Sequence, residues 1–434
     1  MNGTLKIFGG NPLFGSINPV SNKNAVVAVL PLCLLTNQDC IYNNLPKTTD
    51  VEKILQMLKK LGAKVKDDDY NKVVINCKNV NSYEVDFNLG STIRASLNFA
   101  GPLLTRFGQA VIPLPGGCTL GVRSINTHLD SFLKAGVTYK TTQTHVHLKI
   151  SDKPKSLIWQ TEASPTGTEN LISLLAVTGN KTTVIEAAAE PHVTQVEKIL
   201  VKMGANIKGI SSNQLKITGC KKLSGFNFTP EPDFVDITGH IIAAAITNGK
   251  ITIKNSNYLF MEGVISWLKK FNISIKKSNK DLVATVKSPL KLVNYKNSFP
   301  LANENLPKFS PKPWPGFPVD CLPAIVTLSC KTKGQILINN WMYETGLEYV
   351  NQLKQLGAKI DILDNQKIIV NGPITFTGGT VTTPDIIEAT KAIFLAALAD
   401  PVETVINNAN FLKRRYPTIV EDYIKLGANI KIIE

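Results

Sequence analysis

The sequence predicts an α/β protein of two domains, each built from three repeated units of helices and strands. One phrase marks the units: L-K-K-L-G-A-K-V at 58–65 returns as L-V-K-M-G-A-N-I at 200–207, L-K-Q-L-G-A-K-I at 353–360 and Y-I-K-L-G-A-N-I at 423–430. Degenerate copies at 132–139 and 267–275 bring the number to six. Each copy has the pattern of an amphipathic helix end, a glycine cap and an alternating strand. The 434 residues are too many for one ordinary core and fit two domains.

Composition and charge favour a cytoplasmic protein that binds a small acidic substrate. Residues 1–20 contain one lysine, no continuous apolar stretch and strand-like alternation, so we expect strands there and no signal peptide. The longest apolar run, 25–35, is shorter than the ~20 residues that span a bilayer, so we expect a buried helix. The net charge of +15 comes largely from scattered lysines, so we expect neither a nucleic-acid nor a membrane partner.

Cysteine and histidine usage predicts reduced thiols and no metal site. The seven cysteines form no C-x-x-C pair, and their odd number argues against a disulfide framework. His145 and His147 alternate in one segment without a third ligand nearby. We therefore expect an exposed strand face at these histidines.

Residues 113–123, P-L-P-G-G-C-T-L-G-V-R, form a loop that presents one thiol. Its three glycines and two prolines exclude a regular helix or a central strand. Gly116 and Gly117 let another molecule approach the backbone closely. Cys118, with Arg123 nearby, is either an activated acid or nucleophile or a small buried cysteine in a glycine turn. The loop residues leave both interpretations open.

Three predicted helix starts carry groups that suit an anion. The pair S-N at 21–22 caps a helix that begins around Lys23, whose ammonium group would join the free backbone N–H groups. Arg94 begins the next helix in the same way. Residues 161–170, T-E-A-S-P-T-G-T-E-N, have the pattern of a polar turn before an apolar helix at 171–177. Ordinary capped helices explain the same patterns, and both interpretations stay open.

A proline-rich segment at 307–318 precedes Asp320. So dense a proline run predicts an extended path over the surface or along a cleft, without helix or ladder hydrogen bonds. Asp320 is then either the cap of the apolar helix at 321–328 or a carboxylate aimed into a cleft between the domains.

Four motifs resemble the enolpyruvyl transferase family, and the resemblance covers essentially the whole chain. They are S-N-K-N-A at 21–25, R-A-S at 94–96 continuing into G-P-L-L-T-R-F-G, P-G-G-C-T-L-G-V-R at 115–123, and F-P-V-D at 317–320. The cysteine loop resembles the branch of the family that uses UDP-N-acetylglucosamine in peptidoglycan synthesis. The resemblance implies transfer of the enolpyruvyl group of phosphoenolpyruvate to the sugar 3-hydroxyl with release of phosphate, without a cofactor.

The resemblance also implies the architecture known as the inside-out α/β barrel. Two globular domains of three units each are joined by two chain crossings, and the active site lies in the cleft between them. We place one crossing in T-P-E-P-D-F at 229–234. The first domain is then 22–231 with the cysteine loop, and the second is 1–21 together with 232–434.

The resemblance implies a role for each matching residue. The phosphate of phosphoenolpyruvate would be held by Lys23, Arg123 and Arg414, and the UDP-sugar would be contacted by Asn24, Arg94, Ser164 and Asp320. Cys118 would add to phosphoenolpyruvate and protonate its methylene carbon, and Asp320 would be the base for the 3-hydroxyl. The implied catalytic set is Cys118, Asp320, Lys23 and Arg414.

The chain also departs from the family. Gly346 and Ile387 stand where the family carries the two arginines that grip the substrate carboxylate, and Arg415 is a candidate to replace one of them. Asn126 replaces an acidic residue after the cysteine loop, and Glu162 replaces a lysine near the nucleotide. Each lost charge-assisted contact would weaken the carboxylate grip by ~1.5–3 kcal/mol.

These departures leave three hypotheses in order of preference. The first is enolpyruvyl transfer to UDP-N-acetylglucosamine. The second keeps the reaction and changes the acceptor to another nucleotide or sugar phosphate. The third is a paralogue that binds nucleotide-sugar without turnover. A nucleic-acid binder is a distant fourth, because the sequence has neither a recognition helix nor an aromatic stacking platform.

Overall fold

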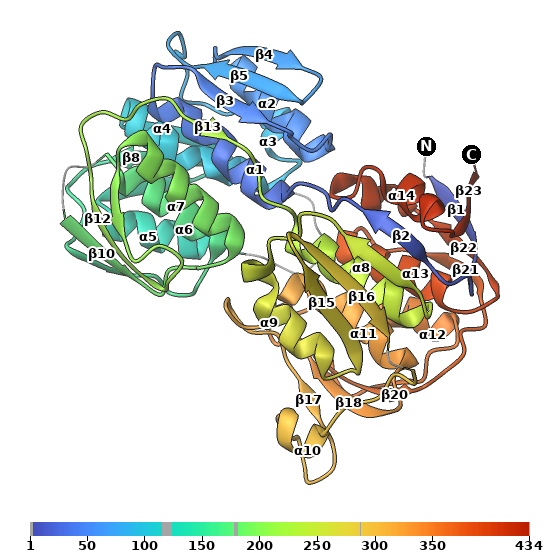
Figure 1. The fold of residues 1–434 in the computed structure, drawn as a ribbon. Coiled ribbons are helices and arrows are strands. Elements are labelled where there is room, and N and C mark those ends of the chain that lie inside the picture. Colours follow the sequence, from blue (N-terminus) through green and yellow to red (C-terminus); the bar gives the residue numbers. More distant parts are fainter. Residues whose placement is uncertain (1–2, 115–123, 178–180, 287, 434) are drawn as a thin grey trace. The chain divides into compact units, whose positions relative to one another are not determined.

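The computed structural model describes residues 3–114, 124–177, 181–286 and 288–433, which form two compact units (Figure 1). The N-terminal unit contains the described residues from 21 to 231, and the C-terminal unit contains 3–20 together with 232–433. Each unit has its own hydrophobic core. The chain therefore starts in the C-terminal unit, leaves it after Val20 and returns at Pro232.

All six copies of the repeated phrase form the predicted helix, cap and strand. Each cap residue has a positive φ, between +66° and +113°, which turns the chain from the helix into the strand. The sets are α2 (Thr49–Lys60), Gly62 and β4 (Lys64–Asp68); α5 (Asn126–Lys134), Gly136 and β7 (Val137–Thr141); α7 (Pro191–Met203), Gly204 and β11 (Asn206–Lys208); α9 (Tyr258–Lys269), Asn272 and β15 (Ile273–Ser278); α12 (Val350–Gln355), Gly357 and β19 (Ile360–Ile362); and α14 (Ile419–Lys425), Gly427 and β23 (Asn429–Ile433).

Each set contributes the edge strand of one sheet, antiparallel to its neighbour. The N-terminal unit contains the sheets β13-β3-β5-β4, β6-β8-β7 and β11-β12-β10-β9, whose further strands are β3 (Cys40–Asn43), β5 (Lys72–Asn76), β6 (Gln109–Pro113), β8 (His145–Ile150), β9 (Leu157–Trp159), β10 (Lys181–Ile185), β12 (Gln214–Thr218) and β13 (Asn227–Phe228).

The C-terminal unit repeats this arrangement and includes the two predicted strands at the start of the chain. Its sheets are β21-β22-β1-β23, β15-β16-β14-β2 and β17-β18-β20-β19. Their further strands are β1 (Thr4–Phe8), β2 (Phe14–Ile17), β14 (Lys250–Ile253), β16 (Asp281–Val286), β17 (Lys308–Phe309), β18 (Gly334–Asn339), β20 (Lys367–Gly372), β21 (Gly379–Thr382) and β22 (Glu403–Asn407).

The opposite edge of each sheet is parallel to its neighbour in five of the six sheets. In the sheet β6-β8-β7, the isolated parallel bridge between Glu84 and Val111 takes this place. The six units therefore share one strand order.

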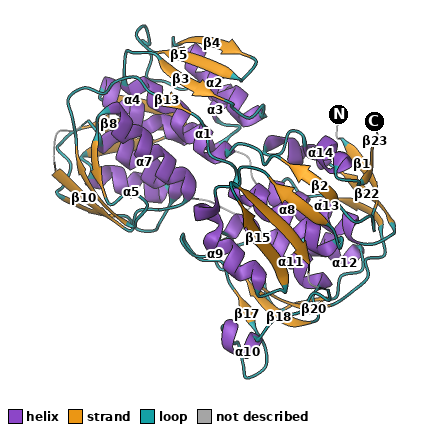
Figure 2. Cartoon of the chain, in the orientation of Figure 1, coloured by secondary structure: helices purple, strands orange, loops and turns teal. Residues whose placement is uncertain are grey.

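Helices fill the interior of each unit and the sheets lie outside them (Figure 2). In the C-terminal unit, α8 (Phe234–Ile246), α11 (Leu322–Lys331) and α13 (Ile387–Ala399) pack against one another, and every residue of α8 is buried. The N-terminal unit has α1 (Lys23–Val29), α4 (Ala100–Phe107) and α6 (Pro165–Leu175), with the 3-10 helices η1 (Leu30–Leu35) and η2 (Arg94–Phe99). Short helices elsewhere are α3 (Phe87–Gly90), α10 (Tyr295–Ser298), η3 (Val319–Cys321) and η4 (Ala409–Arg414).

Two local predictions were wrong. Residues 165–170 belong to α6 and are not a turn. Thr168, Glu169 and Asn170 are buried there and each makes a side-chain hydrogen bond, although Oε1 of Glu169 has no partner among the described residues. The proline-rich segment 307–318 forms a short ladder, since β17 pairs with β18 and the Pro307 carbonyl accepts from the backbone N–H of β18. Proline lacks only the donor, so its carbonyl still bonds to a neighbouring strand.

Candidate active site

The candidate residues fall in both units. The N-terminal unit carries Lys23, Asn24, Arg94 and Ser164, and the C-terminal unit carries Asp320 and Arg414. Cys118 and Arg123 lie outside the described residues, so their roles stay predictions. The two groups are described separately below.

Lys23 is the first residue of α1, and the side chain of Asn22 caps this helix by accepting from the backbone N–H of Ala25 at 3.0 Å. This confirms the predicted helix start. The Lys23 ammonium pairs with a carboxylate, Asp50 Oδ2, at 2.9 Å. The side chains of Lys23 and Asp50 are only 13% and 5% exposed. The structure gives Asn24, the next residue, no side-chain hydrogen bond within the described part of the chain.

Arg94 and Ser164 lie at the starts of two further helices. Arg94 is the first residue of η2, and its Nη2 donates to the carbonyl of Ser124 at 2.9 Å, just before α5. Ser164 caps α6, because its Oγ accepts from the backbone N–H of Gly167 at 3.2 Å. It makes no capping box, since the third helical residue is a glycine rather than Glu or Gln.

The N-terminal ends of α5 and α6 are joined by side-chain hydrogen bonds. Thr127 donates to Glu162 at 2.8 Å, and the His128 ring lies 3.0 Å from the Thr166 hydroxyl. Burial, together with the smaller effect of the nearby Arg94 charge, lowers the pKa of His128 to about 3. His128 is therefore neutral at pH 7. Arg94, in contrast, places a positive side chain beside two helix N-termini, an arrangement that suits phosphate groups.

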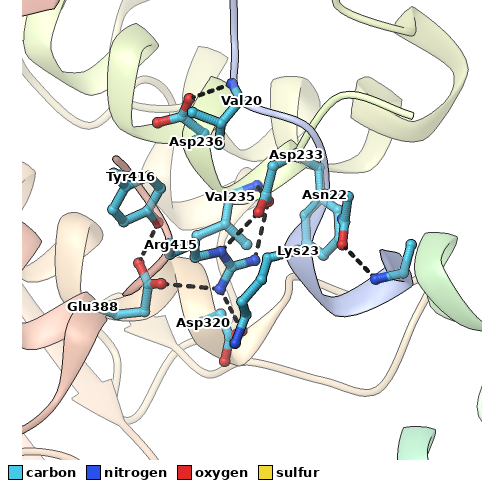
Figure 3. A network of polar contacts seen from close by, with 12 residues as sticks. Val20, Asn22, Lys23, Asp233, Val235, Asp236, Asp320, Glu388, Arg415 and Tyr416 are labelled. Carbon is cyan, nitrogen blue, oxygen red and sulfur yellow. Dashed lines mark hydrogen bonds and ion pairs between the residues drawn. The ribbon is translucent and has the colours of Figure 1, made fainter. Parts of the chain in front are cut away.

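Asp320 lies in η3 and is held by a buried arginine rather than by a helix cap (Figure 3). Arg415 Nη1 donates to Asp320 Oδ2 at 3.1 Å. Neither η3 nor α11, both fully described, has a side-chain cap, so the cap interpretation of Asp320 is wrong. The Asp320 side chain keeps 33% exposure, so it is partly open to solvent.

Arg415 is itself fixed by two more carboxylates. Its Nε and Nη2 bind the two oxygens of Asp233 at 2.7 and 3.0 Å, and its Nη1 also donates to Glu388 Oε1 at 2.9 Å. The hydroxyl of Tyr416 donates to Glu388 Oε2 at 2.8 Å. Burial raises the pKa of Glu388, while Arg415 works in the opposite direction. The nearby acidic groups raise the pKa of Arg415 although burial opposes this, so the guanidinium stays charged.

A second ion pair contacts this cluster through Tyr416. Lys391 Nζ donates to Asp236 Oδ1 at 2.8 Å and lies 3.7 Å from the ring centroid of Tyr416. Asp236 Oδ2 accepts from the backbone N–H of Val20 at 3.0 Å and lies 3.1 Å from His240 Nε2. Although burial alone would raise it, the pKa of Asp236 is held below its usual range by His240 and Lys391.

The positions of the missing arginines carry no charge. A Cβ on Gly346 would lie 2.2 Å from the side-chain nitrogen of the buried Asn340. Ile387 is the first residue of α13 and packs against the hydrophobic core. Arg415 does not replace a substrate-binding arginine, because it is 3% exposed and its fork is occupied by carboxylates. Arg414, the last residue of η4, lies 5.9 Å from the ring centroid of Phe411.

Sequence reasoning missed the partners of the predicted residues. Asp50 follows the N-cap Thr48 in α2, and this T-T-D pattern signals a helix start but not an ion pair with Lys23. Asp233 was visible only as part of an acidic, proline-rich segment. Nothing in the sequence around Glu388 signals its bond to Arg415.

The described residues contain neither a membrane-spanning helix nor a metal-binding cluster. No helix in the described part of the chain is long and apolar enough to cross a membrane. No group of three or more His, Cys, Asp or Glu side chains within these residues is arranged to hold a metal ion.

Comparison with known proteins gives consistent results for sequence and fold. The profile of the family described as EPSP synthase (3-phosphoshikimate 1-carboxyvinyltransferase) matches residues 7–423. UDP-N-acetylglucosamine 1-carboxyvinyltransferase from Borreliella burgdorferi is 32% identical over 426 residues, which cover 98% of each chain. UDP-N-acetylglucosamine 1-carboxyvinyltransferase 2 from Clostridium acetobutylicum is 34% identical over 429 residues, again 98% of each.

Solved structures share the architecture. The enolpyruvyl transferase NikO from Streptomyces tendae superposes with a TM-score of 0.86 at 21% identity, over 100% of this chain and 99% of NikO. EPSP synthase from Acinetobacter baumannii gives a TM-score of 0.74 at 17% identity, with both chains fully covered. At these identities the likeness establishes the two-domain α/β fold alone.

Proposed function

Because this chain belongs to the EPSP synthase family of carboxyvinyltransferases, we propose that it transfers the enolpyruvyl group of phosphoenolpyruvate to the 3-hydroxyl of UDP-N-acetylglucosamine. Phosphate is released, and the product enters peptidoglycan synthesis. The observation that carries the proposal is full-length identity of 32–34% with proteins named for this reaction. The charged groups of both units are of the types that the reaction needs.

The acceptor hydroxyl must lose a proton as its oxygen bonds to C2 of phosphoenolpyruvate. Asp320 is the base in this proposal, because it is the exposed carboxylate of the Arg415 cluster. The methylene carbon C3 gains a proton in the same addition, and the thiol of Cys118 supplies it. The C2–O bond to phosphate then breaks, C3 returns a proton to the Cys118 thiolate and the C2–C3 double bond is restored.

Cationic groups stabilise the phosphate as it leaves. Lys23, Arg123 and Arg414 serve this role in the proposal. For Lys23 the support is its place at the N-terminus of α1, where the helix dipole also favours an anion. Because Lys23 already pairs with Asp50, the incoming phosphate competes with that carboxylate.

The diphosphate and sugar of the acceptor bind the N-terminal unit in this proposal. Arg94 lies beside the N-termini of α5 and α6, and Ser164 caps α6. Asn24 is partly exposed on the first turn of α1. The reaction takes place in the cytoplasm in this proposal, since all six cysteines among the described residues are free thiols.

A different acceptor is the second candidate function. The observation that favours it is the uncharged pair Gly346 and Ile387, together with Glu162 bonded to Thr127 where the family carries a lysine. Another nucleotide-sugar or sugar phosphate would fit the same reaction chemistry.

Phosphate release tests the proposal. We expect release only when phosphoenolpyruvate and UDP-N-acetylglucosamine are both present, and its loss in Asp320→Asn and Cys118→Ser. Asp361→Asn, an exposed carboxylate on β19, is the matched control and should retain activity. Release with only another acceptor would support the second candidate. Tight binding of UDP-N-acetylglucosamine without release would contradict enzymatic turnover.

A further inference from the structure

We infer that Arg415 is a positioning residue, which holds one oxygen of Asp320 so that the other oxygen faces the acceptor hydroxyl. The inference rests on the proposed function, since it takes Asp320 as the base. Arg415 touches neither substrate in this account. It acts through Asp320 alone.

The guanidinium has little freedom to move. Four hydrogen bonds of 2.7–3.1 Å occupy Nε, Nη1 and Nη2, and the side chain is 4% exposed. The planar fork of arginine fixes the directions of these bonds relative to one another. A shift toward or away from Asp320 would therefore stretch the bonds to Asp233 and Glu388.

The partners of Arg415 are anchored in different helices of the C-terminal unit. Asp233 caps α8, because its Oδ1 accepts from the backbone N–H of Val235 at 2.9 Å. The backbone N–H of Asp233 donates to the Val20 carbonyl at 2.8 Å. Glu388 belongs to α13, and its second oxygen accepts from the Tyr416 hydroxyl. Arg415 therefore fixes Asp320 relative to α8 and α13 (Figure 3).

Exposure separates the three carboxylates into supports and a reactive group. The side chains of Asp233 and Glu388 are 0% and 13% exposed, whereas that of Asp320 is 33% exposed. Arg415 binds Oδ2 of Asp320, and within the described residues the structure gives Oδ1 no hydrogen bond. Because Asp320 caps no helix, its carboxylate has no local backbone bond to orient it. Its orientation therefore depends on Arg415.

Arg415→Lys tests this assignment. Lysine keeps the charge but cannot direct N–H groups to three carboxylates at fixed angles. We expect kcat to fall by about 10- to 100-fold, the range expected when a base is misplaced by about 1 Å. KM for either substrate should change by less than about threefold, because Arg415 contacts neither. Arg106→Lys is the matched control, since Arg106 also binds several oxygens but lies in the N-terminal unit. It should change stability and leave kcat unchanged.

If Arg415→Lys does not fold, a second pair of variants tests the inference. Arg415→Lys/Glu388→Gln removes one carboxylate that the smaller cation cannot reach, and Glu388→Gln alone is its reference. We expect kcat of Arg415→Lys/Glu388→Gln to be about 10- to 100-fold lower than kcat of Glu388→Gln. An unchanged kcat in folded Arg415→Lys, or a loss carried mainly by KM, would overturn the inference.

Crystal structures separate this inference from the proposed function. We expect the Asp320 carboxylate to adopt more than one orientation in Arg415→Lys and a single one in the wild type and Arg106→Lys. If the wild type released no phosphate with any acceptor, the proposed reaction would be wrong. The Asp320 orientation would still decide whether Arg415 positions it, and an unchanged orientation would refute the positioning role.

Discussion

Under the proposed function Lys23 binds phosphate, so its ion pair with Asp50 should couple the stability of the N-terminal unit to anion binding. Asp50→Asn removes the charge of Asp50 while keeping its shape, and leaves the Lys23 ammonium near the positive end of α1. Breaking a fully buried ion pair costs about 3–5 kcal/mol. Because the Lys23 side chain is 13% exposed and gains some hydration, we expect a loss of about 2–3 kcal/mol. This corresponds to a fall of about 4–12 °C in the unfolding midpoint of a unit of this size.

A phosphate bound to Lys23 would restore the missing negative charge. The rise in the unfolding midpoint with inorganic phosphate should therefore be larger for Asp50→Asn than for the wild type. The measurement is thermal unfolding at pH 7.5 with phosphate exchanged for chloride at constant ionic strength, so that general screening is the same in all samples. With phosphoenolpyruvate in place of phosphate, the rise in the unfolding midpoint should again be larger for Asp50→Asn than for the wild type.

The double variant Lys23→Met/Asp50→Asn is the control. It has neither charge, so we expect it to be more stable than Asp50→Asn and to show the smallest response to phosphate. An equal phosphate response in Asp50→Asn and in the double variant would show that Lys23 does not bind the anion. A loss of less than about 1 kcal/mol in Asp50→Asn would show that the pair contributes no more than an exposed salt bridge.

Three further predictions concern stability and are measured by urea or thermal unfolding. Gly204→Ala should lower the free energy of unfolding by about 1–2 kcal/mol, because of its positive φ alone. Gly136→Ala should lower it by about 3 kcal/mol or more, because its Cβ would also lie 2.3 Å from a backbone carbonyl oxygen. Equal losses in the two variants would contradict this reasoning. Burial raises the pKa of Glu197 to about 7. The free energy of unfolding therefore falls as pH rises from about 4.5 to about 7, because the unfolded state ionises this carboxylate more easily than the folded state. Glu197→Gln should therefore stabilise the protein by up to about 3 kcal/mol at pH 8 and change little at pH 5; the same effect at both pH values would refute the reasoning. Lys391→Met should cost about 3–5 kcal/mol by leaving Asp236 short of its cation, and adding Asp236→Asn should recover part of the loss; a further loss in the double variant would count against the ion pair.

The repeated architecture was predictable because its signals are local. A glycine that follows a helix with a leucine-rich face predicts a left-handed cap, and all five glycine caps have φ above +80°. The degenerate copy at 267–275 has Asn272 at the cap position, a residue that also tolerates positive φ, so it forms the same turn. Likewise, the Asn22 cap and the start of α1 were visible in the sequence because they involve residues within three positions of each other.

The candidate site was only partly predictable because its contacts are not local. Arg415 lies 95 positions from Asp320 and 182 from Asp233, and no periodic pattern connects these residues. The motif resemblance drew attention to Asp320 and Arg414. It suggested Arg415 only as a substitute for a substrate-binding arginine, whereas its contacts with Asp233, Asp320 and Glu388 depend on packing among helices. Glu388 shows the same limit, since its neighbour Ile387 was noticed for a missing charge while Glu388 itself was overlooked.

The placement of β1 and β2 has a consequence for how the chain is made. These strands are synthesised early, yet β1 lies between β22 and β23, and β2 pairs with β14. Residues 21–231 have all their strand partners within their own stretch and can complete their sheets while synthesis continues. By contrast, β2 cannot pair until β14 has been synthesised, and β1 stays unpaired until β22 and β23 have left the ribosome. The order of translation thus makes β1, in the first segment of the C-terminal unit, one of the last strands to pair in its sheet.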